Sequence, residues 1–165
     1  METYRRFLAG GDAAEEIAHQ AAPLEGIALA AAETAIEESI GQRVGLERDM
    51  QAALRRAIEQ LEAGLVIVDG GAERSVESGR IDITARDSDG ATVVIELKAG
   101  AAWQAAVAQI LTYMGDVVLE EPDAVVRGIL VASTFDKKAV AAARMAPSLS
   151  LKAYSVKFQF ADASV

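Results

Sequence analysis

The chain has 165 residues, of which 52% are hydrophobic and 25% charged, a composition that suits one globular domain with its own core. It has no cysteine, which excludes a disulfide framework and any thiolate metal site. The net charge of −9 argues against a sequence-independent nucleic-acid binder, which normally presents a basic surface. No apolar run approaches the roughly 20 residues of a membrane span, and the first residues lack the apolar segment of a signal peptide. We therefore expect a cytoplasmic protein without membrane contact.

Residues 1–41 hold most of the negative charge, with a net charge of −6 against −3 for residues 42–165. They are rich in Ala and Glu at helical spacing, which predicts one or two short helices up to about Pro23 and a longer helix to about Gly41. Their apolar stripe is too small for a separate core. We expect an acidic helical extension that packs on residues 42–165, on a second copy in a homodimer, or on a partner protein.

Residues 42–165 alternate between helical and strand patterns. The clearest helix is predicted over 44–62, where Glu47 sits at the N-terminal end of the buried face and Gly64 stops the helix. Three or four strands, a helix, a strand, a helix and a strand are expected to follow. The strands are predicted over 65–71 with a turn, 72–76, 79–87, 91–98, 125–134 and 151–158, where Tyr154, Val156 and Phe158 alternate, and the helices over 101–119 and 137–145.

The predicted hairpin GRIDITARDSDGATVVIELK, residues 79–98, carries charged residues among its apolar ones. Its loop, Ser88–Gly90, suits a three-residue hairpin turn with Gly90 in the left-handed conformation, so that Asp87 pairs with Ala91. The alternation of side chains then defines two faces. In this register Ile83 lies opposite Ile95, Ile81 opposite Leu97 and Asp82 opposite Glu96, with Ile81, Ile83, Val93, Ile95 and Leu97 on one face and Asp82, Thr84, Glu96 and Lys98 on the other.

Asp82 and Glu96 therefore form a pair of like charges. Residues directly opposite each other have Cβ atoms about 4.5–5.5 Å apart, so one of the two carboxyl pKa values would rise unless a cation binds between them. A divalent cation takes carboxylate oxygens, and the backbone carbonyl of Leu97 is available to the same ion. Lys98 lies on the same face, where its ammonium group can meet a phosphate oxygen or an attacking water. The arrangement suits metal-assisted hydrolysis of a phosphodiester.

These residues resemble a known family. Asp82 followed by Glu96-Leu97-Lys98, in the predicted order of helices and strands, resembles the PD-(D/E)xK nuclease superfamily, which has the restriction-endonuclease-like fold. More narrowly, residues 46–135 are similar to the nuclease domain of the NucS-type (EndoMS) DNA endonucleases. The similar elements are an acidic residue that opens a helix, then GRID, then IELK, then a helix with glutamine and tyrosine four residues apart.

The resemblance implies roles for the matching residues. Asp82 and Glu96 would be ligands of Mg²⁺ or Mn²⁺, Lys98 would be the catalytic lysine, and Glu47 would be an auxiliary acid that reaches the metal or its water. The NucS-type enzymes also carry a separate N-terminal DNA-binding and dimerisation domain. Residues 1–41 do not resemble that domain, so mismatch specificity is not implied.

The same four residues have structural interpretations. Asp82, Glu96 and Lys98 would alternatively form a plain cross-strand ion pair on a solvated face. Glu47 would alternatively be an acid in the first turn of its helix, where the helix dipole favours negative charge.

The remaining candidates also carry two interpretations each. The resemblance places Gln109 and Tyr113 along the site, where they would contact the substrate, whereas Tyr113 would otherwise be a core residue with its hydroxyl at the edge. Arg80 would meet a phosphate or pair with Glu77. We expect Trp103 to be a packing or partner-binding residue rather than a platform for base stacking, and the two lysines Lys137 and Lys138 to be solvated or to contact a phosphate.

We expect an α/β, restriction-endonuclease-like core over residues 42–165, with a helix, a mixed central sheet and flanking helices, and a helical extension over residues 1–41. The predicted function is a metal-dependent DNA endonuclease that binds DNA weakly and with the help of its metal ion. The alternative is a catalytically inactive nuclease-fold module used for protein binding or oligomerisation, which the negative charge favours. A third interpretation keeps the chemistry but moves it to RNA or to an effector role.

Overall fold

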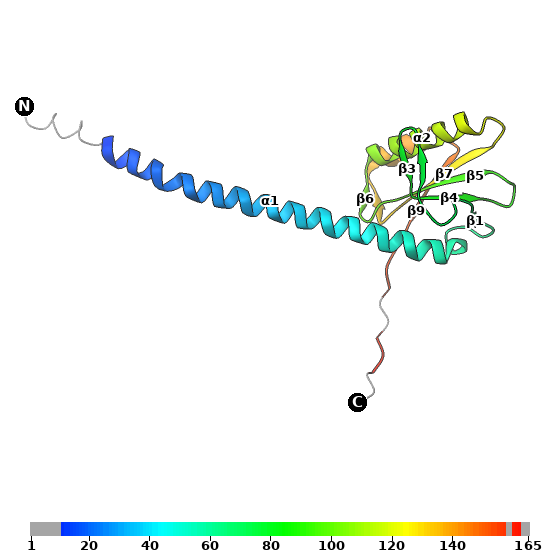
Figure 1. The fold of residues 1–165 in the computed structure, drawn as a ribbon, viewed down its shortest axis with the longest axis horizontal. Helices are drawn as coiled ribbons and strands as arrows, with labels where there is room; N and C mark the ends of the chain where they lie inside the picture. The colour runs from blue at the N-terminus through cyan, green and yellow to red at the C-terminus, as the bar shows by residue number, and fades with distance from the viewer. Residues whose placement is uncertain (1–10, 158–159, 163–165) are drawn as a thin grey trace, which may run out of the picture. The chain divides into compact units, whose positions relative to one another are not determined.

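The computed structural model describes residues 11–157 and 160–162 of the chain. The chain divides into two compact units, Met1–Gln42 and Arg43–Val165, and the second of these holds every strand (Figure 1). The α/β architecture and the mixed sheet expected from the sequence are confirmed.

Helix α1 runs without a break over Gly11–Arg56, so the helix ends predicted near Pro23 and Gly41 are wrong. A glycine inside a helix costs about 1 kcal/mol and a proline about 3 kcal/mol relative to alanine. The Ala- and Glu-rich sequence on both sides favours the helix at nearly every other position, and this outweighs the two interruptions. The helix also ends earlier than predicted, and the 3₁₀ turn η1 (Ile58–Gln60) follows it.

The central sheet has five strands in the order β1-β4-β5-β7-β9. The pairs β1–β4 and β4–β5 are antiparallel, whereas β5–β7 and β7–β9 are parallel and are connected by helices. Two short two-stranded sheets flank it, β2 with β3 and β6 with β8. The bounds are β1 Val66–Ile67, β2 Arg74–Val76, β3 Gly79–Ile81, β4 Ile83–Arg86, β5 Thr92–Leu97, β6 Ala101–Ala102, α2 Gln104–Glu120, β7 Val126–Ala132, β8 Thr134–Phe135, α3 Lys137–Ala143 and β9 Leu149–Ala153.

The last strand differs from the prediction. It begins at Leu149 and ends at Ala153, which pairs with Ala132, the last residue of β7. The Tyr154 N–H still donates to the Ala132 carbonyl at 3.0 Å, but β7 ends at that residue, so the strand does not continue and the predicted alternation with Val156 is wrong. Phe158, the third residue of that alternation, lies outside the described residues.

Each face of the sheet packs against helices. On one face, Val94 and Leu130 contact the apolar side of α2, including Ile110 and Val117, together with α3. The opposite face packs against the end of α1 (Figure 1). There the sheet contributes Ile83, Ala85, Val93, Ile95, Leu97, Ile129 and Val131, and the helical segments contribute Met50, Leu54, Ile58 and Leu61, as the sequence predicts. Unit Arg43–Val165 is thus a helix–sheet–helix sandwich.

The hairpin register is confirmed over β4 and β5 but not at Asp82. Ile83 pairs with Ile95, the Asp87 N–H donates to the Ala91 carbonyl, and Gly90 has a φ of +84°. The predicted single strand 79–87 instead divides at a bend at Asp82: β3 pairs with β2, and β4 pairs with β5. Ile81 therefore does not face Leu97, and it joins the core on the α2 side of the sheet instead.

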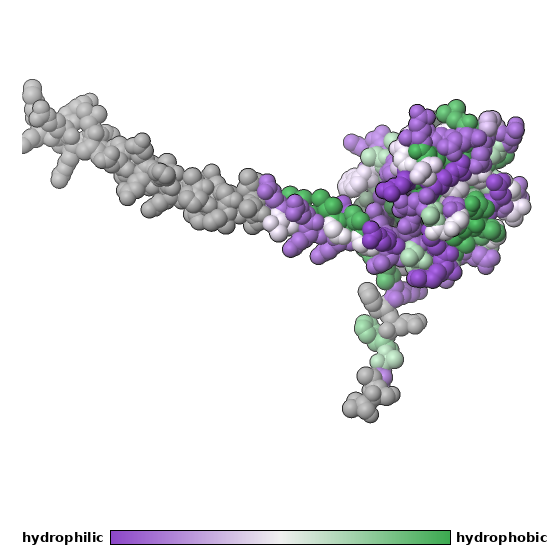
Figure 2. Space-filling view, viewed as in Figure 1, coloured by the Kyte–Doolittle hydropathy of each residue, from purple (hydrophilic) through white to green (hydrophobic). Residues whose placement is uncertain are grey.

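Within the described part of the chain, no helix combines the length and the apolar character that a membrane crossing requires. The face of unit Arg43–Val165 seen in Figure 2 is mostly hydrophilic, with scattered hydrophobic side chains. Hydrophobic side chains that are scattered singly over a surface are normal in soluble domains.

Candidate active site

Asp82 stands in the bend between β3 and β4, and its carboxylate is tied to the neighbouring strand. Its Oδ2 accepts a hydrogen bond from the Leu97 N–H at 2.7 Å, across from the end of β5. Burial raises the pKa of Asp82, while this hydrogen bond and the nearby Lys98 charge oppose the rise. The bend thus turns the carboxylate towards β5 without a strand ladder at this position.

Two side chains of α1 hold the bend. Gln51 Nε2 and Arg55 Nη2 donate to the backbone carbonyl of Asp82 at 2.7 and 2.6 Å. Arg55 also makes a two-pronged ion pair with Asp69, at 2.7 and 2.9 Å, and the Asp69 carboxylate accepts from the Thr84 N–H at 2.9 Å. The Asp69 side chain is fully enclosed. Burial works to raise its pKa, but the hydrogen bonds from Arg55, Thr84 and Gly71 hold that pKa below its usual value.

Glu96 is the buried acid of the site. It lies in β5, is only 3% exposed, and accepts a hydrogen bond from Lys98 Nζ on Oε1 at 2.8 Å. Its other oxygen, Oε2, is buried and has no hydrogen-bond partner among the described residues. Burial, and then the negative charge of Asp82, raise the pKa of Glu96 to about 7. The ion pair considered from the sequence is therefore present between Lys98 and Glu96, but its placement on a solvated face is wrong for Glu96, which is buried.

Lys98 and Glu47 complete the charged group. Burial works to lower the pKa of Lys98, but the negative charges of Glu96, Glu47 and Asp82 together raise it, so the ammonium form is stable at neutral pH. Glu47 comes from α1, and its Oε1 accepts from the Ala99 N–H at 3.1 Å, directly after Lys98. Because α1 begins at Gly11, Glu47 is far from a helix start, and its interpretation as a first-turn acid is wrong.

Gln109 and Tyr113 lie one turn apart on α2. Gln109 Nε2 donates to Tyr113 Oη at 2.9 Å. The Tyr113 ring is buried in the core, as the structural interpretation predicts, and its hydroxyl packs on Gly79. A Cβ at position 79 would lie 2.8 Å from Tyr113 Oη, so only glycine allows this approach. The bond from Gln109 leaves the Gln109 carbonyl oxygen free to accept.

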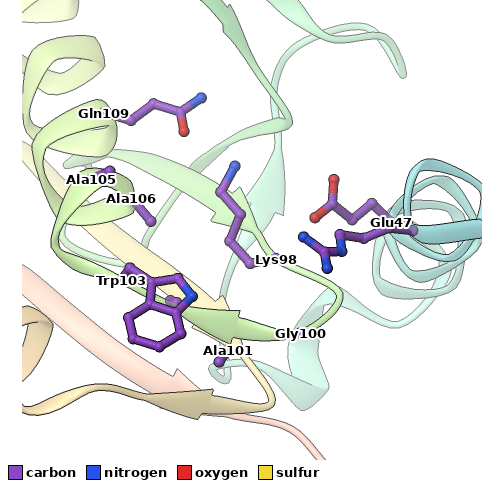
Figure 3. A pocket seen from close by; sticks show the side chains of 10 residues that line it. Glu47, Lys98, Gly100, Ala101, Trp103, Ala105, Ala106 and Gln109 are labelled. Atoms are coloured by element: carbon purple, nitrogen blue, oxygen red, sulfur yellow. The ribbon is translucent and has the colours of Figure 1, made fainter. Parts of the chain in front are cut away.

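A cleft of about 440 Å³ opens beside Lys98. In Figure 3, Gln109 from α2 and Glu47 from α1 point towards each other across Lys98, and Trp103 borders the cleft near Ala101. The remaining lining residues are Arg43, Gly100, Ala102, Ala105 and Ala106. The structure thus gathers Glu47, Lys98 and Gln109 around one hollow.

The candidate residues at the edge of the site differ in how well they match the expectations from the sequence. The Arg80 side chain is 73% exposed and contacts Glu73 at 3.5 Å, rather than Glu77. Trp103 is 63% exposed, so its interpretation as a packing residue is wrong. Lys137 and Lys138 are solvated at the start of α3.

The sequence analysis missed the residues that support the site. Gln51 and Arg55 continue a polar series with Arg43 and Glu47, each four residues after the last, along the edge of the apolar face of α1. Side chains at this spacing lie on one side of a helix. This series of four polar residues beside the buried face of the helix was therefore the sequence pattern that could have indicated Gln51 and Arg55.

The carboxylates fit a hard divalent cation. Over residues 11–157 and 160–162, no three acidic or imidazole side chains are grouped so that they alone could hold a metal ion. Asp82 and Glu96 supply two carboxylates, and a Mg²⁺-like ion commonly takes only one or two from the protein and keeps several waters. A cation between the two carboxylates would give the unpaired Glu96 Oε2 a partner and would offset the repulsion between Asp82 and Glu96. The donor set thus fits such an ion.

Comparisons with known proteins match this picture. Endonuclease NucS of Thermococcus kodakarensis is 45% identical over 60 residues, which are 36% of this chain and 23% of that protein. The structure of an EndoMS–dsDNA complex superposes with a TM-score of 0.61 at 29% identity, over 70% of this chain and 46% of that one. A repair endonuclease from Pyrococcus abyssi gives 0.59 and 29%, over 66% and 46%. The chain therefore spans less than half the length of these relatives.

The family comparison covers the candidate site as a whole. A model described as the Endonuclease NucS C-terminal domain matches residues 46–154, a range that begins just before Glu47 and ends just after β9. Since this range is well over half of the sequence, the chain belongs to the family of Endonuclease NucS C-terminal domains.

Proposed function

We propose that this chain is a metal-dependent DNA endonuclease that hydrolyses phosphodiester bonds, with Mg²⁺ or Mn²⁺ held by Asp82, Glu96 and the carbonyl of Leu97. The observation that carries the proposal is the buried Glu96 carboxylate, with one oxygen unpaired in the described structure and with Asp82 as a charged neighbour. Buried like charges persist where a ligand compensates them. Membership of the NucS C-terminal domain family and the likeness to an EndoMS–dsDNA complex support DNA as the substrate.

The metal ion would activate a water molecule and neutralise the phosphate that is attacked. Asp82 and Glu96 bring the negative charge that retains it, and the bend held by Gln51 and Arg55 fixes the Asp82 carboxylate in place. Preorganised charge of this kind avoids reorganisation during the reaction.

Lys98 acts as a cation rather than as a base, because its pKa is raised and it carries its proton at neutral pH. Its Nζ now donates to Glu96, and it would donate instead to a phosphate oxygen of the bound strand. An ammonium group at that point stabilises the charge that accumulates on the phosphate.

Glu47 and Gln109 face this region from two sides (Figure 3). Glu47 uses Oε1 to accept from Ala99, which leaves Oε2 to orient a water. Gln109 is oriented by Tyr113 and would contact the substrate through its carbonyl oxygen. Arg80 would contact a phosphate farther along the strand, since its guanidinium is exposed.

The proposal is tested with three variants and one control. Asp82→Ala and Glu96→Ala should abolish Mn²⁺ binding in calorimetry and cleavage of DNA, whereas Lys98→Ala should abolish cleavage but keep the metal. Asp89→Ala removes an exposed acid of the hairpin loop and should change neither. The cleavage screen covers single-stranded, duplex, branched and mismatched DNA, and RNA. If the three variants cut as well as the parent, the site is wrongly assigned.

A second candidate function is a non-enzymatic module that binds a protein or a second copy through residues 1–41. The observations that favour it are the net charge of −9 and the exposed apolar side chains Ile36 and Ile40 on α1. Such a module should bind no Mn²⁺ between Asp82 and Glu96, so the same calorimetry separates the two functions.

A further inference from the structure

Trp103 is the single tryptophan of the chain, and 63% of it is exposed. It stands immediately before α2, and its side chain makes no capping hydrogen bond there. A large aromatic ring that neither packs in the core nor caps a helix keeps most of its apolar surface in water. Such exposed apolar area is typical of a binding surface when it borders a cleft.

The cleft beside Trp103 has a floor of small residues. Gly100, Ala101, Ala102, Ala105 and Ala106 have no side chain longer than a methyl group, and a Cβ added at Gly100 would meet nothing within 4 Å. A flat ring can therefore approach the backbone of the β6–α2 segment closely. The volume of about 440 Å³ falls in the usual range of ligand pockets, roughly 300–1,000 Å³.

The cleft is lined by two cations and one acid. Lys98, which pairs with Glu96, and Arg43 supply the cations, Glu47 supplies the carboxylate, and Arg43 makes no ion pair within the described residues. Trp103 and the alanine floor supply the apolar part (Figure 3). A ligand that matches this division has a phosphate at one end and a planar ring at the other, which is the chemistry of a nucleotide.

We propose that the cleft holds one nucleotide of the DNA strand next to the phosphate at Lys98, with its base stacked on the Trp103 indole. The inference rests on the function proposed above and adds a base-binding subsite to it. Stacking on an indole face needs no particular base, because every base has such a face. The subsite therefore contributes affinity without sequence specificity, and it compensates for the low positive charge of the protein.

Because Trp103 is the only tryptophan, its emission reports on this cleft alone. The full chain is titrated with a labelled oligodeoxythymidylate of eight nucleotides and with an abasic oligomer of the same length. Ca²⁺ is present so that the DNA binds but is not cleaved. Anisotropy of the label measures binding, and tryptophan emission measures stacking. We expect the thymidylate to quench the emission and the abasic oligomer to bind more weakly without quenching.

Variants measure the size of the effect. Substitution of a base-stacking aromatic residue by alanine weakens binding by about 5- to 150-fold. Trp103→Ala should weaken thymidylate binding by that factor and leave abasic binding unchanged, whereas Trp103→Phe should retain most of the affinity. Leu119→Ala, which removes an exposed apolar side chain at the far end of α2, should have no effect.

The outcomes separate the subsite from the enzyme. If the chain binds and, with Mn²⁺, cleaves DNA while its emission stays constant, or if Trp103→Ala binds as the parent does, the subsite is refuted and the nuclease proposal stands. If neither oligomer binds and no DNA is cleaved, both proposals fail. Quenching by the thymidylate together with the loss of affinity on Trp103→Ala supports the subsite.

Discussion

Glu96→Gln should stabilise the metal-free protein at alkaline pH. The pKa of Glu96 is raised to about 7 from its usual value of 4.5, because the side chain is buried and close to Asp82. At about 1.4 kcal/mol per pH unit between these two values, the ionised side chain destabilises the fold by about 3 kcal/mol above pH 7. Glutamine has the same shape and can still accept from Lys98, but it does not ionise.

The sign follows from proton binding. The folded state holds the Glu96 proton more tightly than the unfolded state, so this side chain contributes stability below pH 4.5, and that stability is lost as the pH rises through 7. Between pH 5 and pH 8 the parent should lose about 2.5 kcal/mol in EDTA from this group, equivalent to about 5–10 °C in Tm. Glu96→Gln should lack this component.

The assay is urea denaturation in EDTA at pH 5, 6, 7 and 8 for the parent, Glu96→Gln and Glu77→Gln, the last an exposed acid that serves as the control. Addition of Mn²⁺ at pH 8 should restore stability to the parent but not to Glu96→Gln. If the parent and Glu96→Gln lose equal stability across this range, Glu96 is not a strained carboxylate, and the argument for a cation at this point loses its basis.

Three further predictions follow from the site and from the charge distribution. Arg55→Ala should lower the free energy of unfolding, measured in urea, by about 3–5 kcal/mol, because it leaves the enclosed Asp69 carboxylate without its partner. The control Arg56→Ala changes the exposed neighbouring arginine and should have little effect. Equal urea midpoints for the two variants would contradict this prediction. Deletion of residues 1–41 should change the mass in solution or the solubility, and a soluble truncation with unchanged mass and melting would count against a packing role. DNA binding measured with Ca²⁺ should be weak and metal-dependent, with a log–log salt slope of roughly −3 to −4 from three or four phosphate contacts, and tight metal-free binding with a slope near −8 would reveal a basic surface not recognised here.

The salt slope depends on which basic residues are near the site. Arg86 is far from it, at the other end of β4, where it pairs with Thr92 and donates to the Gly90 carbonyl. Arg86 is four residue steps along the chain from Asp82, about 13 Å for an extended strand. The three or four contacts are therefore expected from among Lys98, Arg43, Arg80 and the pair Lys137 and Lys138.

The hairpin was predictable because its determinants are local. The Ser88–Gly90 loop and the alternation of Val93, Ile95 and Leu97 fix the register of β4 and β5, and this register places Glu96 and Lys98 on one face. The bend at Asp82 was not predictable in the same way. Nothing in GRIDITARD interrupts a strand, and the bend depends on Gln51 and Arg55, which are distant in sequence.

The helices show the same division between local and distant determinants. The buried face predicted for the helix over 44–62 follows from helical spacing and is confirmed at the end of α1. The continuity of α1 through Gly41 depends on the sum of many small helix propensities along the segment. A single glycine is therefore a poor indicator of where this helix ends. The exposure of Trp103 depends on what packs around the start of α2, which spacing alone does not report.

The hydrogen bond between Lys98 and Glu96 would make metal loading of the proposed site an exchange reaction. In the metal-free protein the lysine is a tethered monovalent counter-ion beside one oxygen of Glu96. A divalent ion bound to that carboxylate would displace the ammonium group but not remove it, because Lys98 is only two residues from Glu96 in the chain. Metal binding would therefore also free the ammonium group that the proposed mechanism needs for the phosphate.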